Sequence, residues 1–244
     1  MLPASYGIIG YPLAHSFSAV YFAKKFAAEN IDATYTPFPL QSINEFNELL
    51  IKHPGLRGLS VTIPHKTAVI PFLDALDDAA KEIGAVNSIA IKNSSKKGYN
   101  TDVIGFEESL KPLLRPTHKR ALVLGTGGAS KAVCYVLKKL GIEYQLVSRT
   151  GQNGMIIYDD LNRELIQSHT LIINTTPLGM YPAIDTFSQL PYEYISAAHL
   201  LYDLVYNPAE TKFLVLGKRQ GATIKNGLDM LHIQAEASWK IWNS

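Results

Sequence analysis

The sequence predicts an α/β protein with two domains, and three observations support that prediction. Apolar segments of strand length alternate with amphipathic segments of helix length along the 244 residues. A glycine-rich turn, "LGTGGAS", follows one buried strand and precedes a helix. From Arg120 onward the strands recur as in a doubly wound unit. This alternation is typical of mainly parallel sheets covered by helices.

The first half is expected to alternate strands and helices. Its strands are "YGIIG", "ATYTPF" and "GLSVTI", followed by "AVNSIAI" and "GYNT", which flank the turn-rich "KNSSKKG" and predict a hairpin. Helices are expected at residues 17–30, after the capping box from Ser42 to Glu45, and around residues 76–83.

The second half is expected to form a separate sheet from "RALVLG", "EYQLVSR", "TLIINTT" and "LLYDLVY". The last helix, residues 228–242, should leave this sheet and pack back on the first half. We therefore predict a first domain of residues 1–102, completed by residues 228–244, and a Rossmann-like dinucleotide-binding domain of residues 103–227.

Composition excludes several classes of protein. With 47% hydrophobic and 18% charged residues, the chain has ample material for a core. A net charge of +2 gives no support for nucleic-acid or membrane-surface binding. The single cysteine, Cys134, cannot form an internal disulfide or a cysteine-based metal site, and it favours a reducing compartment. No segment reaches the length of a membrane span and residues 1–23 lack a basic leader, so we expect a cytoplasmic protein.

The glycine-rich turn indicates a dinucleotide site. Gly125 permits the tight turn and Gly127 lets the backbone approach a pyrophosphate, while the following helix presents N–H donors. Ser130 stands where the third glycine of the usual pattern would be, and an ordinary strand-to-helix turn is the alternative.

The next strand ends in Ser148-Arg149-Thr150 rather than in an acidic residue. A guanidinium with two flanking hydroxyls suits a ribose 2′-phosphate and favours NADP over NAD. An arginine at a solvated sheet edge is the alternative. Thr175 and Thr176 follow another strand of the same unit, at the carboxyl edge where ligands bind, although an unliganded loop would also explain them.

In the first half, "SVTIPHK" brings Ser60, Thr62 and Lys66 to the end of one strand. This pattern suits a polar pocket for a small hydroxylated molecule, and a solvated strand end is the alternative. "HSFS" after the first strand can present hydroxyls and amides to a carboxylate, or simply cap a helix. Asn87 can read a hydroxyl or serve a structural role.

Asp102 precedes a helix, so N-capping is its ordinary role. A carboxylate beside Lys66 would form a proton-handling pair. The lysine could then act as a cation that polarises a carbonyl or as a proton donor to an alkoxide, and the sequence leaves this choice open. No motif of a serine hydrolase, zinc protease or P-loop kinase is present.

These motifs together resemble the shikimate dehydrogenase family. The shared segments are "GYPLAHSFS", "SVTIPHK", "GAVNS", "NTDVIGF", "LGTGGASKA", "SRT", "INTTPLGM", "YDLVYNPAETKFL" and "NGLDMLHIQA", in the family's order from Gly10 to Gln234. The resemblance implies NADP-linked reduction of 3-dehydroshikimate to shikimate in aromatic amino-acid biosynthesis.

The resemblance also implies site residues. Lys66 and Asp102 are then the catalytic pair at the 3-oxygen, and Ser16 and Ser18 hold the substrate carboxylate. The implied contacts to the ring, its hydroxyls and the rest of the substrate are Ser60, Thr62, Asn87, Tyr206 and Gln234. The implied cofactor residues are Gly125, Thr126, Gly127, Gly128, Ala129, Ser130, Ser148, Arg149, Thr150, Thr175, Thr176 and Gly227. Neither a metal nor a nucleic-acid partner is implied, and both monomers and homodimers occur in the family.

This chain departs from the family pattern at several places. Ser60 replaces the asparagine of many members, and Asn153 stands where a second basic residue often follows the arginine. The segment after Thr150 also looks shortened by a helix. We therefore expect NADP to be preferred by a smaller margin over NAD. Relatives that accept quinate often carry threonine at position 18, so Ser18 favours shikimate. A quinate-accepting enzyme and a non-catalytic sensor of the same fold are the alternatives.

Overall fold

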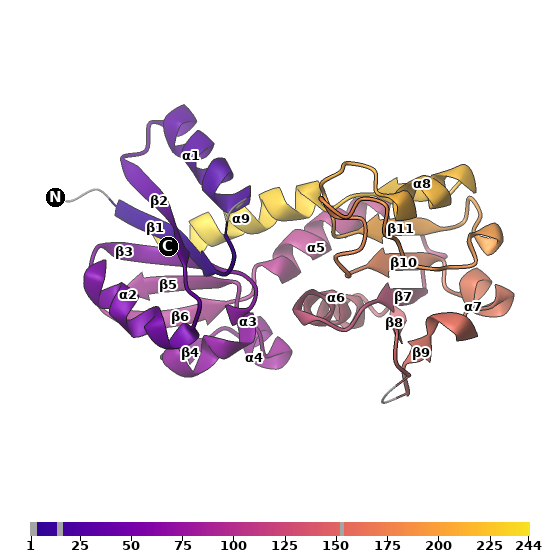
Figure 1. Ribbon diagram of the computed structural model, residues 1–244, viewed down its shortest axis with the longest axis horizontal. Helices are drawn as coiled ribbons and strands as arrows, with labels where there is room; N and C mark the ends of the chain where they lie inside the picture. The colour runs from indigo at the N-terminus through magenta and orange to yellow at the C-terminus, as the bar shows by residue number, and fades with distance from the viewer. Residues whose placement is uncertain (1–3, 14–16, 152–153) are drawn as a thin grey trace. The chain divides into compact units, whose positions relative to one another are not determined.

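The computed structural model describes residues 4–13, 17–151 and 154–244. Its Cα packing divides the chain into two compact units (Figure 1). Unit 1 comprises Met1–Thr101 and Ala235–Ser244, and unit 2 comprises Asp102–Gln234. The predicted roles of the two halves, substrate binding and cofactor binding, stay predictions at this point.

Unit 1 contains one mixed sheet. Its strand order is β2 (Ala33–Pro39), β1 (Ala4–Gly10), β3 (Leu56–Val61), β5 (Ser88–Lys92), β6 (Ser95–Tyr99) and β4 (Ala75–Leu76). β1 pairs in parallel with both β2 and β3, whereas β5 is antiparallel to β3 and β6. The predicted hairpin is therefore confirmed as β5–β6.

The helices of unit 1 cover both faces of this sheet. They are α1 (Phe17–Glu29), η1 (Ile43–Glu45), α2 (Phe46–Lys52), α3 (His65–Ala68), η2 (Ile70–Phe72) and α4 (Asp78–Ile83). The predicted capping box is confirmed at Ser42 and Glu45, although it opens the 3₁₀ turn η1 before α2. Phe46 and Leu49 of α2 pack with Ile9 on one face, and Phe22 and Phe26 of α1 pack with Tyr6 on the other.

Unit 2 contains a wholly parallel sheet. Its order is β12 (Thr223–Lys225), β11 (Leu200–Asp203), β10 (Leu171–Asn174), β7 (Arg120–Leu124), β8 (Glu143–Ser148) and β9 (Ile156–Ile157). From β7 the chain builds outward to β8 and β9, then returns to the other side of β7 with β10. This reversal creates a topological switch point, where doubly wound sheets bind their ligands. The buried apolar residues of β7 and β10 are typical of strands covered on both faces.

The helices of unit 2 follow the predicted alternation. They are α5 (Asp102–Leu110), η3 (Lys111–Leu113), α6 (Gly128–Lys139), η5 (Tyr158–Asp160), α7 (Arg163–Ser168), η6 (Tyr192–Tyr194), α8 (Lys212–Arg219) and α9 (Leu228–Asn243), whose residues from Ala235 onward belong to unit 1. The segment that looked shortened contains one six-residue helix, α7.

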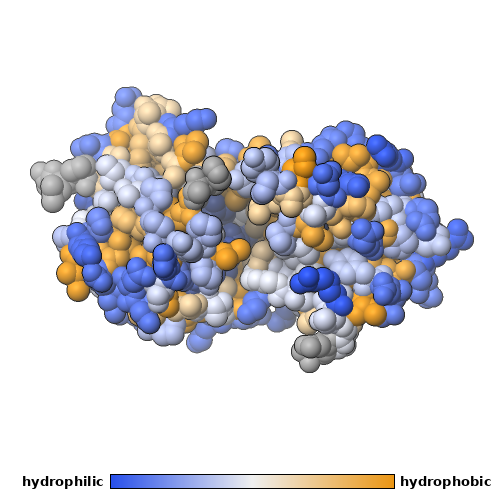
Figure 2. All heavy atoms as spheres, viewed as in Figure 1, coloured by the Kyte–Doolittle hydropathy of each residue, from blue (hydrophilic) through white to orange (hydrophobic). Residues whose placement is uncertain are grey.

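On the face seen in Figure 2, apolar residues are scattered among hydrophilic ones in each unit. Within the described residues, no helix is both long and apolar enough to cross a membrane.

Candidate functional sites in the two units

The carboxyl ends of β1 and β3 lie side by side in unit 1. The Thr62 N–H donates to the Ile9 carbonyl over 2.9 Å, and the Tyr11 N–H donates to the Ile63 carbonyl over 3.0 Å. A Cβ atom at Gly10 would lie 2.3 Å from Cγ2 of Thr62, so only glycine fits there. These contacts hold Thr62 at the strand end, as the sequence predicts.

Ser60 and Ser18 are linked by a residue that sequence reasoning missed. Ser60 is buried near the end of β3, and the Tyr35 hydroxyl donates to its Oγ over 2.8 Å. The same phenol is hydrogen-bonded to the Ser18 side chain, on the first turn of α1. Nothing in the sequence marks Tyr35 beyond its place in an alternating strand. Ser16 lies outside the described residues.

Lys66 lies on α3, immediately after the Pro64 that follows β3. The preceding residue, His65, is buried, and its Nε2 is hydrogen-bonded to the Leu40 carbonyl over 2.8 Å. The Lys66 carbonyl accepts a hydrogen bond from the Val86 N–H over 2.8 Å. The backbone that carries the half-buried lysine is therefore fixed on both sides.

Asn87 has a structural role, whatever it also contributes to binding. Its buried amide oxygen accepts the Thr101 N–H over 2.6 Å, and its Nδ2 donates to Thr101 Oγ1 over 3.0 Å. Thr101 is fully buried and also shares a hydrogen bond with Ser238 of α9, at 3.0 Å. Sequence reasoning missed Thr101, although it lies inside the "NTD" motif.

The result of these bonds is to fix the residue directly before Asp102. Asp102 was expected as an N-cap, but it is the first residue inside α5, and Thr101 precedes the helix. A carboxylate in the first turn still faces the positive end of the helix dipole.

The glycine turn in unit 2 has the geometry that a dinucleotide needs. Gly125 has φ +101°, and a Cβ there would lie 2.8 Å from Cγ2 of Thr176. A Cβ at Gly127 or Gly128 would meet nothing within 4 Å, so the backbone is open for close approach. Gly127 caps the twelve-residue helix α6 without a side-chain hydrogen bond to its first amides. The turn thus fits a pyrophosphate on this helix N-terminus.

Several hydroxyls around this turn are already engaged. Ser130 is buried and donates to the Gly127 carbonyl over 2.6 Å. Thr175 Oγ1 donates to the Leu124 carbonyl over 2.7 Å, and Thr176 Oγ1 donates to Asn174 Oδ1 over 2.6 Å. Because their protons point into the protein, these side chains can only accept hydrogen bonds from a ligand and otherwise shape the turn.

The end of β8 presents its arginine to solvent. Ser148 accepts the Thr150 N–H over 3.1 Å and also donates to the Thr150 carbonyl, which closes a tight local turn. Arg149 is exposed at this turn. β8 lies next to β7 in the sheet, so its carboxyl end and the glycine turn share one edge. The pair fits a dinucleotide that carries a 2′-phosphate.

A buried carboxylate supports the switch point and was missed from the sequence. Asp203, at the end of β11, accepts hydrogen bonds from Asn174 Nδ2 (2.9 Å), Thr211 Oγ1 (2.5 Å) and the Val205 N–H (3.0 Å). Burial raises the pKa of Asp203 to about 6. This network ties the ends of β10 and β11 together directly before Thr175 and Thr176.

Three further predicted contacts lie in unit 2. Tyr206 is half-buried, and burial raises the pKa of its phenol. Gln234 is buried on α9, and its Nε2 donates to the Leu231 carbonyl over 2.9 Å. The Gly227 N–H donates to the Val205 carbonyl over 3.2 Å. The Gly227 carbonyl accepts the Leu231 N–H over 3.1 Å, so a nicotinamide carboxamide could use only the second lone pair of this oxygen.

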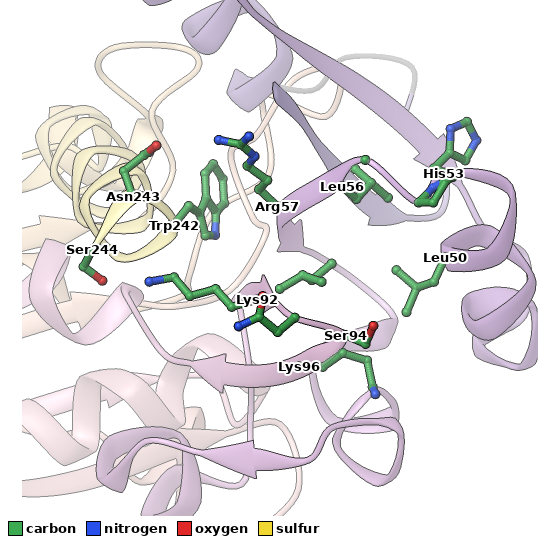
Figure 3. A pocket seen from close by; sticks show the side chains of 14 residues that line it. Leu50, His53, Leu56, Arg57, Lys92, Ser94, Lys96, Trp242, Asn243 and Ser244 are labelled. Atoms are coloured by element: carbon green, nitrogen blue, oxygen red, sulfur yellow. The ribbon is translucent and has the colours of Figure 1, made fainter. Parts of the chain in front are cut away.

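A hollow of about 870 Å³ lies elsewhere in unit 1. Figure 3 shows the basic side chains Arg57, Lys92 and Lys96 among those that line it, together with Trp242. Among the predicted site residues that the structure describes, none lines this hollow. Among the described residues there is also no cluster of His, Cys, Asp and Glu that could hold a metal ion.

Two features together indicate the class of protein. Unit 2 has a parallel sheet with an open glycine turn at its switch point, and the strand ends of unit 1 are followed by hydroxyls and a lysine. The class is that of the two-domain α/β oxidoreductases that use a nicotinamide dinucleotide. Comparison with known proteins identifies the family within this class.

The family model of the shikimate dehydrogenase substrate-binding domain matches residues 8–89. A shikimate dehydrogenase (NADP(+)) of Moorella thermoacetica is 38% identical over 255 residues, 96% of this chain and 86% of the relative. The crystal structure of shikimate dehydrogenase from Aquifex aeolicus has a TM-score of 0.88 and 36% identity, covering 99% of this chain and 92% of that one. The enzyme of Thermus thermophilus, in complex with NADP(H) and shikimate, has a TM-score of 0.86 and 30% identity, with 98% and 93% covered.

The chain therefore belongs to the shikimate dehydrogenase family. The predicted fold class, family, enzyme class and NADP cofactor are confirmed by these likenesses. The roles of individual site residues stay predictions.

Proposed function

We propose that this protein reversibly reduces 3-dehydroshikimate to shikimate with NADPH. Most of the substrate contacts would come from unit 1, joined by Asp102, Tyr206 and Gln234 of unit 2, and unit 2 would hold the cofactor. The observation that carries this proposal is the pairing, in one chain of this family, of two strand-end sites with different chemistry. One offers side-chain hydroxyls and Lys66, and the other offers open backbone at Gly127 and Gly128.

The cofactor supplies the hydride at its nicotinamide ring. Gly125 to Ser130 would hold the pyrophosphate, and Gly227 would contact the nicotinamide amide. Arg149 and Thr150 would hold the 2′-phosphate, while Ser148, which donates its proton to the Thr150 carbonyl, would hold this turn. With a single arginine at the end of β8 and Asn153 beyond it, we expect a moderate preference for NADP over NAD.

On the substrate side, Lys66 and Asp102 act as the catalytic pair at the 3-oxygen. Lys66 holds or donates a proton to that oxygen as its carbon gains the hydride. The carboxylate of the substrate meets Ser16 and Ser18. The remaining contacts to the substrate are Ser60, Thr62, Asn87, Tyr206 and Gln234. Positioning and charge stabilisation are the tasks of the protein here.

We further propose that the enzyme works in the cytoplasm as a monomer or homodimer. The single cysteine, Cys134, supports a reducing compartment, and burial raises the pKa of its thiol to about 11, which makes it unreactive.

The test is to follow the absorbance of reduced nicotinamide while the protein oxidises shikimate or quinate with NADP or NAD. We expect the highest kcat/KM for shikimate with NADP, and a lower but measurable value with NAD. A higher kcat/KM for quinate would assign the chain to quinate oxidation instead. Binding of shikimate without turnover of either substrate would indicate a sensor, and an NAD preference would overturn the role of Arg149.

A further inference from the structure

Tyr35 lies where it can connect two predicted substrate contacts. In the sheet, β1 separates β2 from β3, with Tyr35 beside Tyr6 and Ser60 beside Ile8. The Tyr35 side chain thus spans the middle strand to place its hydroxyl 2.8 Å from Ser60 Oγ. The second partner, Ser18, comes from α1 on the same face of the sheet.

The Tyr35 ring is held by neighbours that leave its hydroxyl little freedom. It stacks on Phe22, with ring centroids 4.6 Å apart and planes 21° apart, and it also contacts the Trp242 ring at 6.3 Å. Phe22 follows Ser18 by four residues on α1, so both side chains face Tyr35 from one side of the helix. Burial raises the pKa of the Tyr35 phenol, which keeps it a neutral hydroxyl at neutral pH.

The hydrogen atoms of this cluster can be counted. Ser18, Tyr35 and Ser60 each carry one hydroxyl proton, and each of the two contacts between them uses one. One proton therefore remains to be donated outward. It belongs to Ser60 when Tyr35 donates to Ser60, and to Ser18 when the hydroxyls rotate and the chain runs in the other direction. Whichever serine does not donate this proton can only accept from a ligand.

We propose that Tyr35 is a positioning residue that joins Ser18 and Ser60 into one chain of hydrogen bonds with a single proton to donate outward. A ligand bound there must accept a hydrogen bond at one serine and donate one at the other. A carboxylate accompanied by a ring hydroxyl meets this demand, so the inference deepens the proposed function and rests on it. Polarisation along such a chain makes recognition at the two ends interdependent.

The test is Tyr35→Phe, which keeps the stacked ring and removes only the hydroxyl. We expect the KM for shikimate to rise about 3- to 10-fold, the loss of a small number of hydrogen bonds, with kcat changed less than about 3-fold. The KM for NADP should not change. Adding Ser60→Ala to Tyr35→Phe should cost less than Ser60→Ala costs in the wild type, because both act through one chain.

Tyr6→Phe is the matched control. Tyr6 lies on the same face of unit 1, but its hydroxyl donates to Asn243 Oδ1 over 3.0 Å, away from the serines. It should reduce the thermal unfolding temperature without changing the KM for shikimate. An unchanged shikimate KM in Tyr35→Phe, equal rises in both KM values, or additive effects with Ser60→Ala would each overturn the proposal. A wild-type protein that does not oxidise shikimate would instead refute the proposed function itself.

Discussion

The two units differ in the kind of group that they offer to a ligand. In unit 1 the candidate groups are side chains that reach one another across the sheet, as Tyr35 does to Ser60 and Asn87 does to Thr101. In unit 2 the candidate groups around the glycine turn are mostly backbone, and the hydroxyls of Thr175 and Thr176 are turned inward. A small hydroxylated substrate needs donors and acceptors at defined points, whereas a pyrophosphate needs open amides and a helix N-terminus.

This difference decides how mutations should act. Substitutions at the strand ends of unit 1 should change turnover or affinity for substrate with little effect on the backbone. Substitutions in the switch-point region of unit 2 should affect folding or the cofactor, depending on whether the residue is strained, buried or open.

The largest effect is expected at Lys66. Lys66→Ala should lower kcat about 10³-fold, within the range that one acid or base contributes, while the dissociation constant for shikimate changes less than about 3-fold. Steady-state kinetics and equilibrium titration measure the two quantities. The exposed Lys81 of α4 is the control, and Lys81→Ala should leave both unchanged. An unchanged kcat in Lys66→Ala would remove this residue from the mechanism.

Next is the pH dependence that Asp203 gives to unit 2. Because the folded pKa of about 6 exceeds the ordinary value of 3.8, the folded state holds the proton more tightly between these values. The contribution of Asp203 to the free energy of unfolding should therefore fall by about 2.4 kcal/mol as pH rises from 4 to 7. Urea unfolding of wild type and Asp203→Asn over this pH range is the measurement. The free energy of unfolding of wild type relative to that of Asp203→Asn should decrease as pH rises.

Asp74 in unit 1 provides a control of opposite sign. Hydrogen bonds from Lys96 hold the pKa of this exposed carboxyl below its ordinary value, so its contribution is lost as pH falls. The difference between wild type and Asp74→Asn should grow with rising pH, although weakly because the pair is solvated. If the difference in free energy of unfolding between wild type and Asp203→Asn grew with pH, burial would not raise the pKa of Asp203.

Two neighbouring glycines in unit 2 should respond differently. Gly125→Ala should lower the free energy of unfolding by about 2 kcal/mol, since φ +101° and Thr176 both oppose a methyl group. Gly127→Ala meets open space and should leave stability unchanged while raising the KM for NADP. If Gly127→Ala binds NADP normally, the pyrophosphate does not approach this backbone.

The smallest effect is expected at Arg149. Arg149→Ala should raise the KM for NADP about 10-fold, as for one exposed charge-assisted contact, and leave the KM for NAD unchanged. Arg120, at the amino end of β7, pairs with Glu143 over 3.1 Å and is the matched control. Equal losses for the two cofactors in Arg149→Ala would show that the guanidinium does not read the 2′-phosphate.

Local signals in the sequence predicted much of this structure. The glycine turn, the capping box at Ser42, the β5–β6 hairpin and the last helix each depend on neighbours in the chain, and each is present. Tyr35 and Asp203 could not be predicted, because their roles arise from partners on other strands or helices. The position of Asp102 was off by one residue, since the buried Thr101 takes the place before the helix.

Our main proposal is that most substrate contacts come from unit 1 and that unit 2 holds the cofactor. It is tested most directly by initial velocities of Thr62→Val and Arg149→Ala with shikimate and NADP both varied. Thr62→Val keeps the methyl group that packs against Gly10 and replaces the hydroxyl with a second methyl group of similar size. We expect Thr62→Val to raise only the KM for shikimate and Arg149→Ala to raise only the KM for NADP. If either substitution raised the KM of the other ligand as much as its own, the division of labour between the units would be contradicted.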